Sequence, residues 1–360
     1  MVSDGSADLP ERLATATATL SIDDDTAAAH LARLDGFATA NVRAGTGGPF
    51  AAELFIHNRS TGDLISLSGP MGNAVLSKGI ASAHAEAETL TEATLEKALT
   101  ILKDNPDDDL QLLQVSSAES CPACRSKQIA FLHRLKAEGW PQDARIEVVF
   151  AATYEDTFRV AGFNDKPYQG DLLGQLRPPM IVQRSMVFAD LPELVRQTAG
   201  HVGAFAGCLM PDPSQAGSTW FEPVVVPVRG LSMEVAALHK ASAARMAAGI
   251  DKPWHLGAEG PAMLYTTADH VGPLMLTDSQ WAGISEIIQI SDRPSTPAES
   301  PLIDNAPLLA RARLAYNAHG SELIVHHLPV GTHGLNNTAQ QVWRDEVMQS
   351  TPEKLYNGVD

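Results

Sequence analysis

Four polar residues in two short stretches constrain this chain more than any other feature of its sequence. The first stretch carries His84, with Glu86 two residues later. The second carries Cys121 and Cys124 as a Cys-x-x-Cys pair. One imidazole and two thiolates are ligands that zinc prefers, and three protein ligands with an open fourth position are typical of a catalytic zinc site. The fold must therefore bring the two stretches together at one point.

The Cys-x-x-Cys pair has other interpretations when it is considered alone. Redox motifs and structural zinc knuckles use the same spacing. A structural site would need a fourth protein ligand, and the sequence offers no obvious one at a suitable distance. Glu86 likewise has a plainer interpretation, as a surface carboxylate favoured at a helix start by the helix dipole. The order of the two stretches is what makes the combination specific.

A His-x-Glu upstream of a Cys-x-x-Cys resembles the signature of the zinc-dependent nucleobase deaminases, in the cytidine deaminase-like superfamily. The resemblance implies that His84, Cys121 and Cys124 hold Zn²⁺ and that Glu86 transfers protons. Zinc in such a site lowers the pKa of a water molecule to about 7 and so makes it nucleophilic. The implied reaction is the hydrolytic release of ammonia from an aminated heterocycle.

The residues around the motif extend this resemblance over roughly residues 25–170. Residues 42–52 resemble the Gly-Gly-Pro-Phe-Gly-Ala segment of bacterial guanine deaminases and their tRNA adenosine deaminase relatives. The loop containing Gly72 and Asn73 resembles the same group. One departure is Ser120, where the family usually has a proline that stiffens the turn before the first cysteine. We expect its replacement to loosen the loop without removing a ligand.

The resemblance also implies a set of four substrate-binding residues, three of which have an alternative interpretation. Phe50 is either a pocket wall that stacks on the base or a core residue. Asn73 either contacts the base or serves as a turn residue. Ala83 belongs to the loop that carries the histidine. Asp165, in a Gly-Phe-Asn-Asp stretch, either reads the base or is a solvated loop residue. The predicted substrate-binding set is Phe50, Asn73, Ala83 and Asp165.

The order of the predicted elements indicates an α/β fold. Apolar spacing predicts a helix, a hairpin, a helix, a strand, a helix, a strand and a short helix. This order favours a three-layer α/β/α sandwich. It places His84 and Glu86 at one helix start and both cysteines at the start of the next, and the positive dipole ends of these helices favour a thiolate and a metal-bound hydroxide. The predicted elements cover residues 26–44, 50–67, 83–102, 110–115, 124–136, 146–151 and 153–160.

The second half of the sequence looks like a degenerate copy of the first. Residues 263–267 resemble the strand that precedes the cysteine pair, but no cysteine follows them. Ser232 stands where the histidine would be, whereas Glu234 is kept. We therefore expect two sandwiches of the cytidine deaminase-like fold, the second without zinc. Its predicted use is structural, as a fused pseudo-subunit that helps to close the first pocket.

The predicted domain plan has five parts. A loose leader precedes the zinc domain, and a Pro-rich linker separates it from the degenerate domain. A C-terminal tail with a short strand near residues 321–325 can fold back over either pocket. The boundaries are 1–25 for the leader, 26–170 for the zinc deaminase domain, 171–179 for the linker, 180–315 for the degenerate domain and 316–360 for the tail.

Composition restricts the partners. The formal net charge is −17, which disfavours tRNA or DNA because nucleic-acid binding draws much of its affinity from basic side chains. No apolar run approaches the ~20 residues of a membrane span, and no secretory signal is visible. Three cysteines fit a reducing compartment. We expect a cytoplasmic protein with a small heterocyclic substrate, no nucleic-acid or membrane partner, and a monomeric (intramolecular pseudo-dimer) or homodimeric state.

The predicted function is zinc-dependent hydrolytic deamination of a guanine-like purine base or nucleoside. Cytosine-type, adenine-type and specialised-metabolite substrates remain alternatives, because a few pocket residues decide the choice. An alternative from a different class is a non-catalytic binding or scaffold pseudo-deaminase, which the degenerate second half supports.

Overall fold

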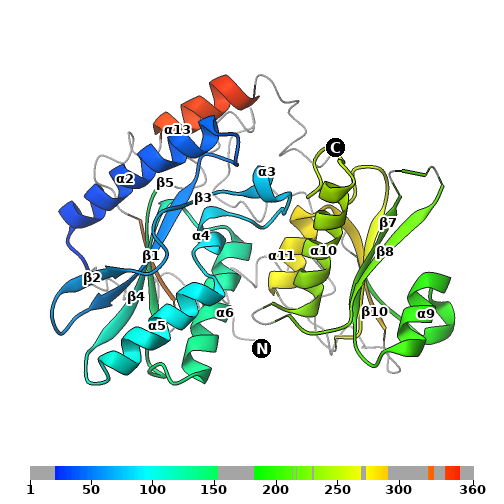
Figure 1. Ribbon diagram of the computed structural model, residues 1–360, viewed down its shortest axis with the longest axis horizontal. Coiled ribbons are helices and arrows are strands. Elements are labelled where there is room, and N and C mark those ends of the chain that lie inside the picture. The colour runs from blue at the N-terminus through cyan, green and yellow to red at the C-terminus, as the bar shows by residue number, and fades with distance from the viewer. Residues whose placement is uncertain are drawn as a thin grey trace, which may run out of the picture.

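Two β-sheets, each covered by helices on both faces, make up the described part of the chain (Figure 1). The mixed α/β class agrees with the sequence prediction. The predicted helix over 153–160, the linker and Asp165 lie outside the described residues. The computed structural model describes residues 21–152, 182–290 except 213, 216, 229–230 and 269–272, then 323–327 and 337–348.

The first sheet has the strand order β11-β5-β4-β1-β2, with the short strand β3 also paired to β1. Strand β1 runs antiparallel to β2, β3 and β4, whereas β5 runs parallel to both β4 and β11. The strands are β1 (Ala51–Asn58), β2 (Asp63–Ser66), β3 (Met71–Gly72), β4 (Leu110–Ala118), β5 (Ile146–Ala152) and β11 (Leu323–His327).

Helices cover both faces of this sheet and make it a three-layer sandwich. Helix α2 (Asp24–Arg43) packs on one face, where its Leu31 and Leu34 meet Phe55 and Leu113. Helices α5 (Glu92–Asp104) and α6 (Pro122–Ala137) pack on the other face in a second buried cluster. Full burial of a side chain of this size contributes about 1.5–3 kcal/mol, so the two clusters hold the layers together.

The helix predicted over 83–102 is in fact two helices. Helix α4 (Ala85–Glu88) ends where the Thr89 hydroxyl donates to the Glu86 carbonyl. Helix α5 then starts anew from Thr91, whose side chain forms a reciprocal capping box with Thr94. The prediction of one helix was wrong because the apolar spacing continues through this break, while the threonines terminate and restart the backbone hydrogen bonds.

The end of the predicted leader is also part of the fold. The Ser21 backbone N–H donates to the carboxylate of Glu147 at 3.0 Å, and Ile22 is buried. The Asp23 side chain accepts a hydrogen bond from the Thr26 N–H at 2.7 Å and so caps α2. The predicted leader over 1–25 is therefore too long at its C-terminal end.

The second sheet repeats the strand order and strand directions of the first. Its order is β6-β10-β9-β7-β8, with β7 antiparallel to β8 and β9, and β10 parallel to β9 and β6. Helix α9 (Glu193–His201) follows the 3-10 turn η1 (Phe188–Asp190). The strands are β6 (Val182–Met186), β7 (Ala206–Pro211), β8 (Thr219–Val224), β9 (Ala262–Thr266) and β10 (Ile284–Ile290).

Helices again lie on both faces of the second sheet. Val195 of α9 packs with Phe205 and Tyr265 on one face. Helices α10 (Met233–Ala247) and α11 (Pro273–Trp281) cover the other face, in a cluster that includes Ala237 and Leu264. We call this sheet with α9, α10 and α11 the second α/β unit, and the first sheet with α2 to α6 the first α/β unit.

The two sheets exchange their outer strands. Strand β6 follows β5 along the chain but pairs with β10 of the second sheet. Strand β11 follows β10 but pairs with β5 of the first sheet. The short strand predicted near residues 321–325 is thus present, and it completes the first sheet. Helix α13 (Asn337–Val342) and the π-helical segment η2 (Trp343–Met348) follow, and α13 lies along α2 (Figure 1).

The two units also pack directly against each other. Helices α10 and α11 face the first unit, and α11 packs on α6 (Figure 1). Gly79, after the short helix α3 (Val75–Lys78), has a φ of +63°, and a Cβ atom there would lie 2.5 Å from Pro253 of the second unit. Only glycine allows this approach without strain.

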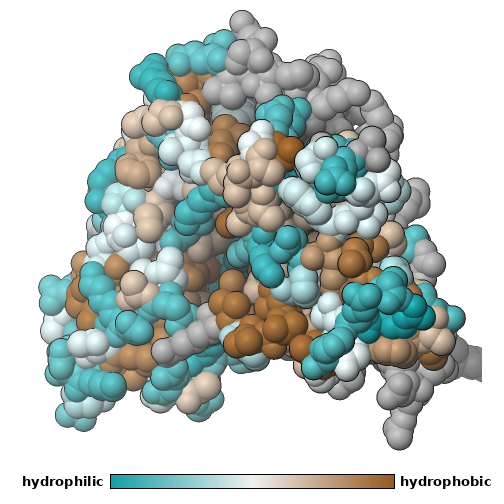
Figure 2. Space-filling view, turned by 45° about the vertical axis from the view of Figure 1, so that its right-hand side comes forward, coloured by the Kyte–Doolittle hydropathy of each residue, from teal (hydrophilic) through white to brown (hydrophobic). Residues whose placement is uncertain are grey.

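The surface is mixed in character. Hydrophilic residues are spread over the face seen in Figure 2, with a hydrophobic group at its lower centre. Within the described residues, no helix combines the length and the apolar character that crossing a membrane requires.

Candidate metal centre

Two helix starts carry the predicted ligands. His84 is the N-cap residue of α4, in extended backbone conformation. Cys121 is the N-cap residue of α6, and its Sγ accepts a hydrogen bond from the Cys124 backbone N–H at 3.3 Å. Strand β4 ends at Ala118 and delivers the first cysteine to this point. The sequence prediction that both stretches meet at helix N-termini is confirmed.

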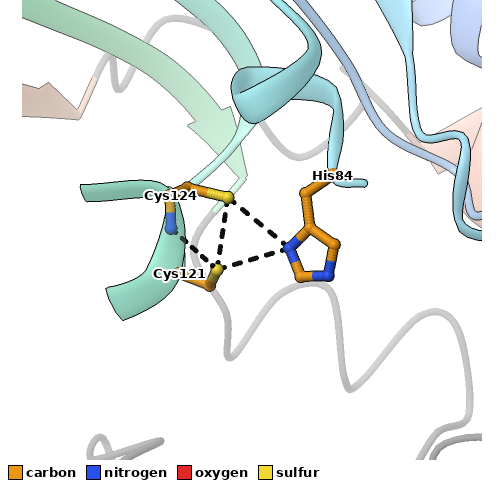
Figure 3. A group of neighbouring side chains, drawn as sticks. All are labelled: His84, Cys121 and Cys124. Carbon is orange, nitrogen blue, oxygen red and sulfur yellow. Dashed lines mark hydrogen bonds between the residues drawn. The ribbon is translucent and has the colours of Figure 1, made fainter. Parts of the chain in front are cut away.

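The three ligand atoms form a small triangle (Figure 3). The His84 Nδ1 atom lies 3.3 Å from the Cys121 Sγ and 3.5 Å from the Cys124 Sγ, and the two sulfur atoms are 3.2 Å apart. Both cysteines are buried and neither forms a disulfide. Ligands around a tetrahedral zinc ion lie roughly 3.5–3.8 Å apart at the usual bond lengths. The separations here are slightly shorter, and one imidazole with two thiols is a donor set that fits zinc.

The local electrostatics favour one thiolate. Burial opposes ionisation of Cys121, but its hydrogen bond with Cys124 and the charge of His84 hold its pKa well below the usual value. Burial disfavours the charged form of His84, yet the Cys121 thiolate raises the imidazole pKa above its usual value. Burial and the same thiolate raise the pKa of Cys124 well above the usual value. A metal cation bound between the two cysteines would stabilise both of them as thiolates.

Glu86 lies beside the triangle. Its side chain is 5% exposed. One carboxylate oxygen accepts a hydrogen bond from the Ser116 hydroxyl at 3.3 Å, and the other lies 3.6 Å from the Cys124 Sγ. Burial, together with the Cys121 thiolate, raises its pKa to about 7. A carboxyl group with this pKa can both accept and donate a proton near neutral pH.

A buried amide network supports α4 and was not predicted from the sequence. The Gln114 amide donates to the Glu86 carbonyl at 3.2 Å and to the Thr89 hydroxyl at 2.7 Å. Gln128 of α6 donates to Gln114 and, at 3.0 Å, to the Ser120 hydroxyl. Ser120 is therefore held by a hydrogen bond instead of a proline ring, and the expected loosening of this turn is not seen. The sequence signal that could have indicated this network is the polar Gln114 within the otherwise apolar strand β4.

The structure describes three of the four predicted substrate-binding residues. The Asn73 N–H donates to the Phe50 carbonyl at 3.0 Å, and the Ala74 N–H donates to the Ala83 carbonyl at 2.8 Å. These contacts join the loops around Phe50, Asn73 and Ala83 next to His84. Asp165 lies outside the described residues.

The side chain of Asn73 has a structural role in this loop. Its Oδ1 accepts hydrogen bonds from the backbone N–H groups of Gly48 and Val75, each at 3.1 Å. A Cβ atom at Gly47 would lie 2.0 Å from the Asn73 carbonyl oxygen, so glycine is required there. The Oδ1 atom of Asn73 therefore has the role of a turn residue. Contact between its amide nitrogen and the base stays a prediction.

The second α/β unit keeps part of this arrangement. Ser232 caps α10 and accepts from the Val235 N–H at 3.3 Å. The buried Glu234 accepts a hydrogen bond from the Thr266 hydroxyl at 2.6 Å, as Glu86 does from Ser116. Among the residues that the structure describes, the triangle in the first unit is the only group of three such side chains close enough to share a metal.

Comparisons with known proteins give structural similarities without a family assignment. No protein-family model matches the chain, and no curated protein matches it significantly. A guanine deaminase from Nitrosomonas europaea is similar at 24% identity, over 48% of this chain and 82% of that one, with a TM-score of 0.28.

Two structures of the protein NE0047 are similar as well. Its complex with 2,6-diaminopurine matches at 26% identity over 44% of this chain and 74% of that one, with a TM-score of 0.28. A mutant in complex with 8-azaguanine matches at 30% identity over 41% and 69%, with a TM-score of 0.27. With TM-scores below 0.5, these similarities do not place the chain in a family, and its function is inferred from its own residues.

Proposed function

We propose that this protein is a zinc-dependent hydrolytic deaminase that releases ammonia from an aminated heterocycle, with a guanine-like purine base or nucleoside as its substrate. The observation that carries the proposal is the buried triangle of His84, Cys121 and Cys124 with the Glu86 carboxylate beside it. A redox or purely structural site does not require a buried carboxylate beside the two cysteines.

Zinc held by three protein ligands supplies Lewis-acid activation of a water molecule. Glu86 accepts one proton from that water and passes it to the ring nitrogen of the substrate. The water oxygen adds to the carbon that carries the exocyclic amine, and Glu86 then accepts the remaining proton of the added hydroxyl group. The C–N bond breaks as Glu86 delivers this second proton to the leaving nitrogen and the carbonyl forms. Ammonia leaves and a carbonyl remains, so no oxidant or reductant is required.

The surroundings orient Glu86 for these transfers. The Ser116 hydroxyl binds one carboxylate oxygen and leaves the other directed toward the cysteines. The Gln114 amide fixes the backbone of the same residue through its carbonyl. Burial excludes bulk water from the carboxyl group, which keeps its pKa near 7 and suits an acid that must also act as a base.

The base is proposed to bind between the loops that carry Phe50, Asn73 and Ala83. Sequence resemblance to the Gly-Gly-Pro-Phe and Gly-Asn segments of guanine deaminases supports this assignment. The short hydrogen-bonded connections from Phe50 to Asn73 and from Ala74 to Ala83 keep these loops next to the metal ligands. Asp165 is proposed as a further base-reading residue from its sequence context alone.

The domain plan stands as part of the proposal: a catalytic domain over 26–170 and a degenerate, zinc-free copy over 180–315, joined by the linker over 171–179. The matched strand orders and the matched hydroxyl–carboxylate pairs at Glu86 and Glu234 support it. A monomer in which the second copy replaces a partner subunit fits this plan. A non-catalytic scaffold is the second candidate, favoured by the loss of ligands in the second unit.

The test is direct. Purified protein is analysed for zinc, and ammonia release is measured with guanine, adenine, cytosine, their nucleosides and pterins. We expect one zinc per chain and ammonia release from a guanine-like substrate. A protein with zinc but with no ammonia release from any member of the panel would support the scaffold candidate, and a protein without zinc would contradict both the site and the reaction.

A further inference from the structure

We infer that the second α/β unit positions the metal ligand His84 through three of its residues, Trp281 and Asp278 on α11 and His239 on α10. This inference rests on the proposed metal site and not on the proposed substrate. These three residues are positioning residues, because they act through His84 and the loop before it.

Trp281 contacts the histidine directly. The indole and imidazole rings meet edge to face, with centroids 5.7 Å apart and planes at 75°. Trp281 also packs against the small cluster of Cys121, Ala123 and Cys124. Edge-to-face contacts have preferred geometries, so the indole limits rotation of the imidazole and holds Nδ1 toward the two sulfur atoms.

Asp278 lies one helical turn before Trp281 and is 2% exposed. Neither carboxylate oxygen makes a hydrogen bond of regular geometry with a described residue. The groups that act on it electrostatically are Lys127, Cys121 and His84, with the Ser82 hydroxyl nearby. A buried carboxylate is costly unless it is paired, so Asp278 depends on the Lys127 ammonium group and the Ser82 hydroxyl beside it.

Asp278 reaches the histidine loop through Lys127. The Lys127 Nζ lies 3.8 Å from the Asp278 carboxylate and donates a hydrogen bond to the Ser82 carbonyl at 3.0 Å. Ser82 stands two residues before His84. The carboxylate of the second unit thus orients a lysine that fixes the backbone of the histidine loop, and its negative charge offsets the lysine charge next to a bound cation.

His239 holds the same loop by its side chain. Its Nε2 lies 3.3 Å from the Ser82 hydroxyl. Both residues line a cavity of about 210 Å³ between the two units, together with Lys127 and Leu231. Ser82 is therefore fixed twice, through its carbonyl by Lys127 and through its hydroxyl by His239.

Within the first unit, the Gln114 amide holds the C-terminal end of α4 through the Glu86 carbonyl and the Thr89 hydroxyl. Helix α4 has four residues, and the side chain of its N-cap residue His84 makes no capping hydrogen bond. A helix of this length is unstable by itself because nucleation is unfavourable. Contacts from outside must keep the histidine in place, and those from the second unit reach both its ring and its loop.

The experiment compares four variants of the full chain. Trp281→Leu removes the ring contact, Trp281→Phe keeps an aromatic edge, and Asp278→Asn removes the charge with little change in shape. Glu234→Gln is the matched control, because it alters a buried carboxylate of the same unit that is hydrogen-bonded to Thr266 of the second sheet. Zinc affinity is measured by chelator competition, and the ligand geometry is measured from the absorption spectrum of the cobalt(II)-loaded protein.

We expect zinc binding to weaken by about 10–100-fold in Trp281→Leu and by roughly tenfold in Asp278→Asn, since residues behind metal ligands have effects of this size. The cobalt spectrum should change in both variants. Trp281→Phe should restore most of the affinity, and Glu234→Gln should match the wild type within about twofold.

The proposal is wrong if folded Trp281→Leu and Asp278→Asn proteins bind zinc like the wild type with unchanged cobalt spectra. If Trp281→Leu does not fold, the zinc affinities and cobalt spectra of Asp278→Asn and Trp281→Phe test the proposal instead. A wild-type chain that binds no metal overturns this inference together with the metal site. If the zinc affinities of the variants follow the expected order but the wild type releases no ammonia, only the proposed reaction is wrong.

Discussion

At the scale of single residues, Glu86 is the group on which the proposed chemistry depends. Glu86→Gln should lower ammonia release by about 10²–10⁴-fold, because the amide cannot transfer protons, while zinc content and folding persist. Glu88→Gln is the matched control on the same helix, since that carboxylate pairs with Lys78 at the surface. Turnover, zinc per chain and the thermal midpoint are the measurements. Equal loss in both variants would contradict a specific role.

The proposed metal ligands give a second prediction at this scale. Cys121→Ser should abolish stoichiometric zinc binding and keep the fold, because serine is a good N-cap for α6. Cys208→Ala is the control, as Cys208 is buried in β7 of the second sheet and lies apart from the ligand triangle. It should lower stability by about 1 kcal/mol and retain zinc, as measured by metal analysis and urea unfolding. Zinc retained by Cys121→Ser would refute this ligand assignment.

At the scale of elements, the sequence predicted what local patterns encode. The His-x-Glu and Cys-x-x-Cys stretches placed His84 and Cys121 at helix starts, and apolar spacing identified α2, β4, α6 and β5. The break between α4 and α5 was missed, because Thr91 and Thr94 stop a helix through hydrogen bonds that apolar spacing does not reveal. The support of Ser120 by Gln128 was missed for a similar reason, since the two residues meet only after α6 has formed.

Gly79 allows a test at the same scale. Gly79→Ala should destabilise the protein by about 2–4 kcal/mol, because a positive φ strains alanine and its Cβ would meet Pro253. Gly45→Ala is matched for the positive φ but has no atom within 4 Å of the added Cβ, so it should cost only about 1–2 kcal/mol. Urea unfolding measures both. Equal losses would show that the contact between the units contributes nothing.

At the scale of the whole molecule, the exchanged strands could not be predicted. The sequence indicated a second copy and a short strand in the tail, but strand pairing depends on partners far away in the chain. Strand β11 pairs with β5, and β6 pairs with β10. If each unit were formed from one continuous segment, β6 would pair in the first sheet and β11 in the second. The structure shows the opposite pairing. With α6 packed on α11, the exchange ties the proposed metal site to the second unit.

This arrangement predicts a pH dependence of stability that originates between the units. Burial, with the charges of Lys127 and Lys78, lowers the pKa of His239 from 6.5 to about 4. Glu88 and Arg134 also line the cavity. The unfolded chain takes up a proton near pH 6.5 and the folded chain does not do so until about pH 4. Stability from neutral His239 is thus present above pH 6.5 and is lost as the pH falls toward 4, by roughly 3 kcal/mol.

His239→Gln should remove this part of the pH dependence, because glutamine stays neutral throughout. Other titrating groups affect the wild type and the variant equally, so the difference between their unfolding free energies isolates His239. We expect that difference to change steadily in urea unfolding from pH 7 to pH 4.5, with the variant losing less stability. His201→Gln, at an exposed position on α9, should follow the wild type. Parallel pH profiles for wild type and His239→Gln would show that protonation of this histidine does not weaken the contact that holds the His84 loop.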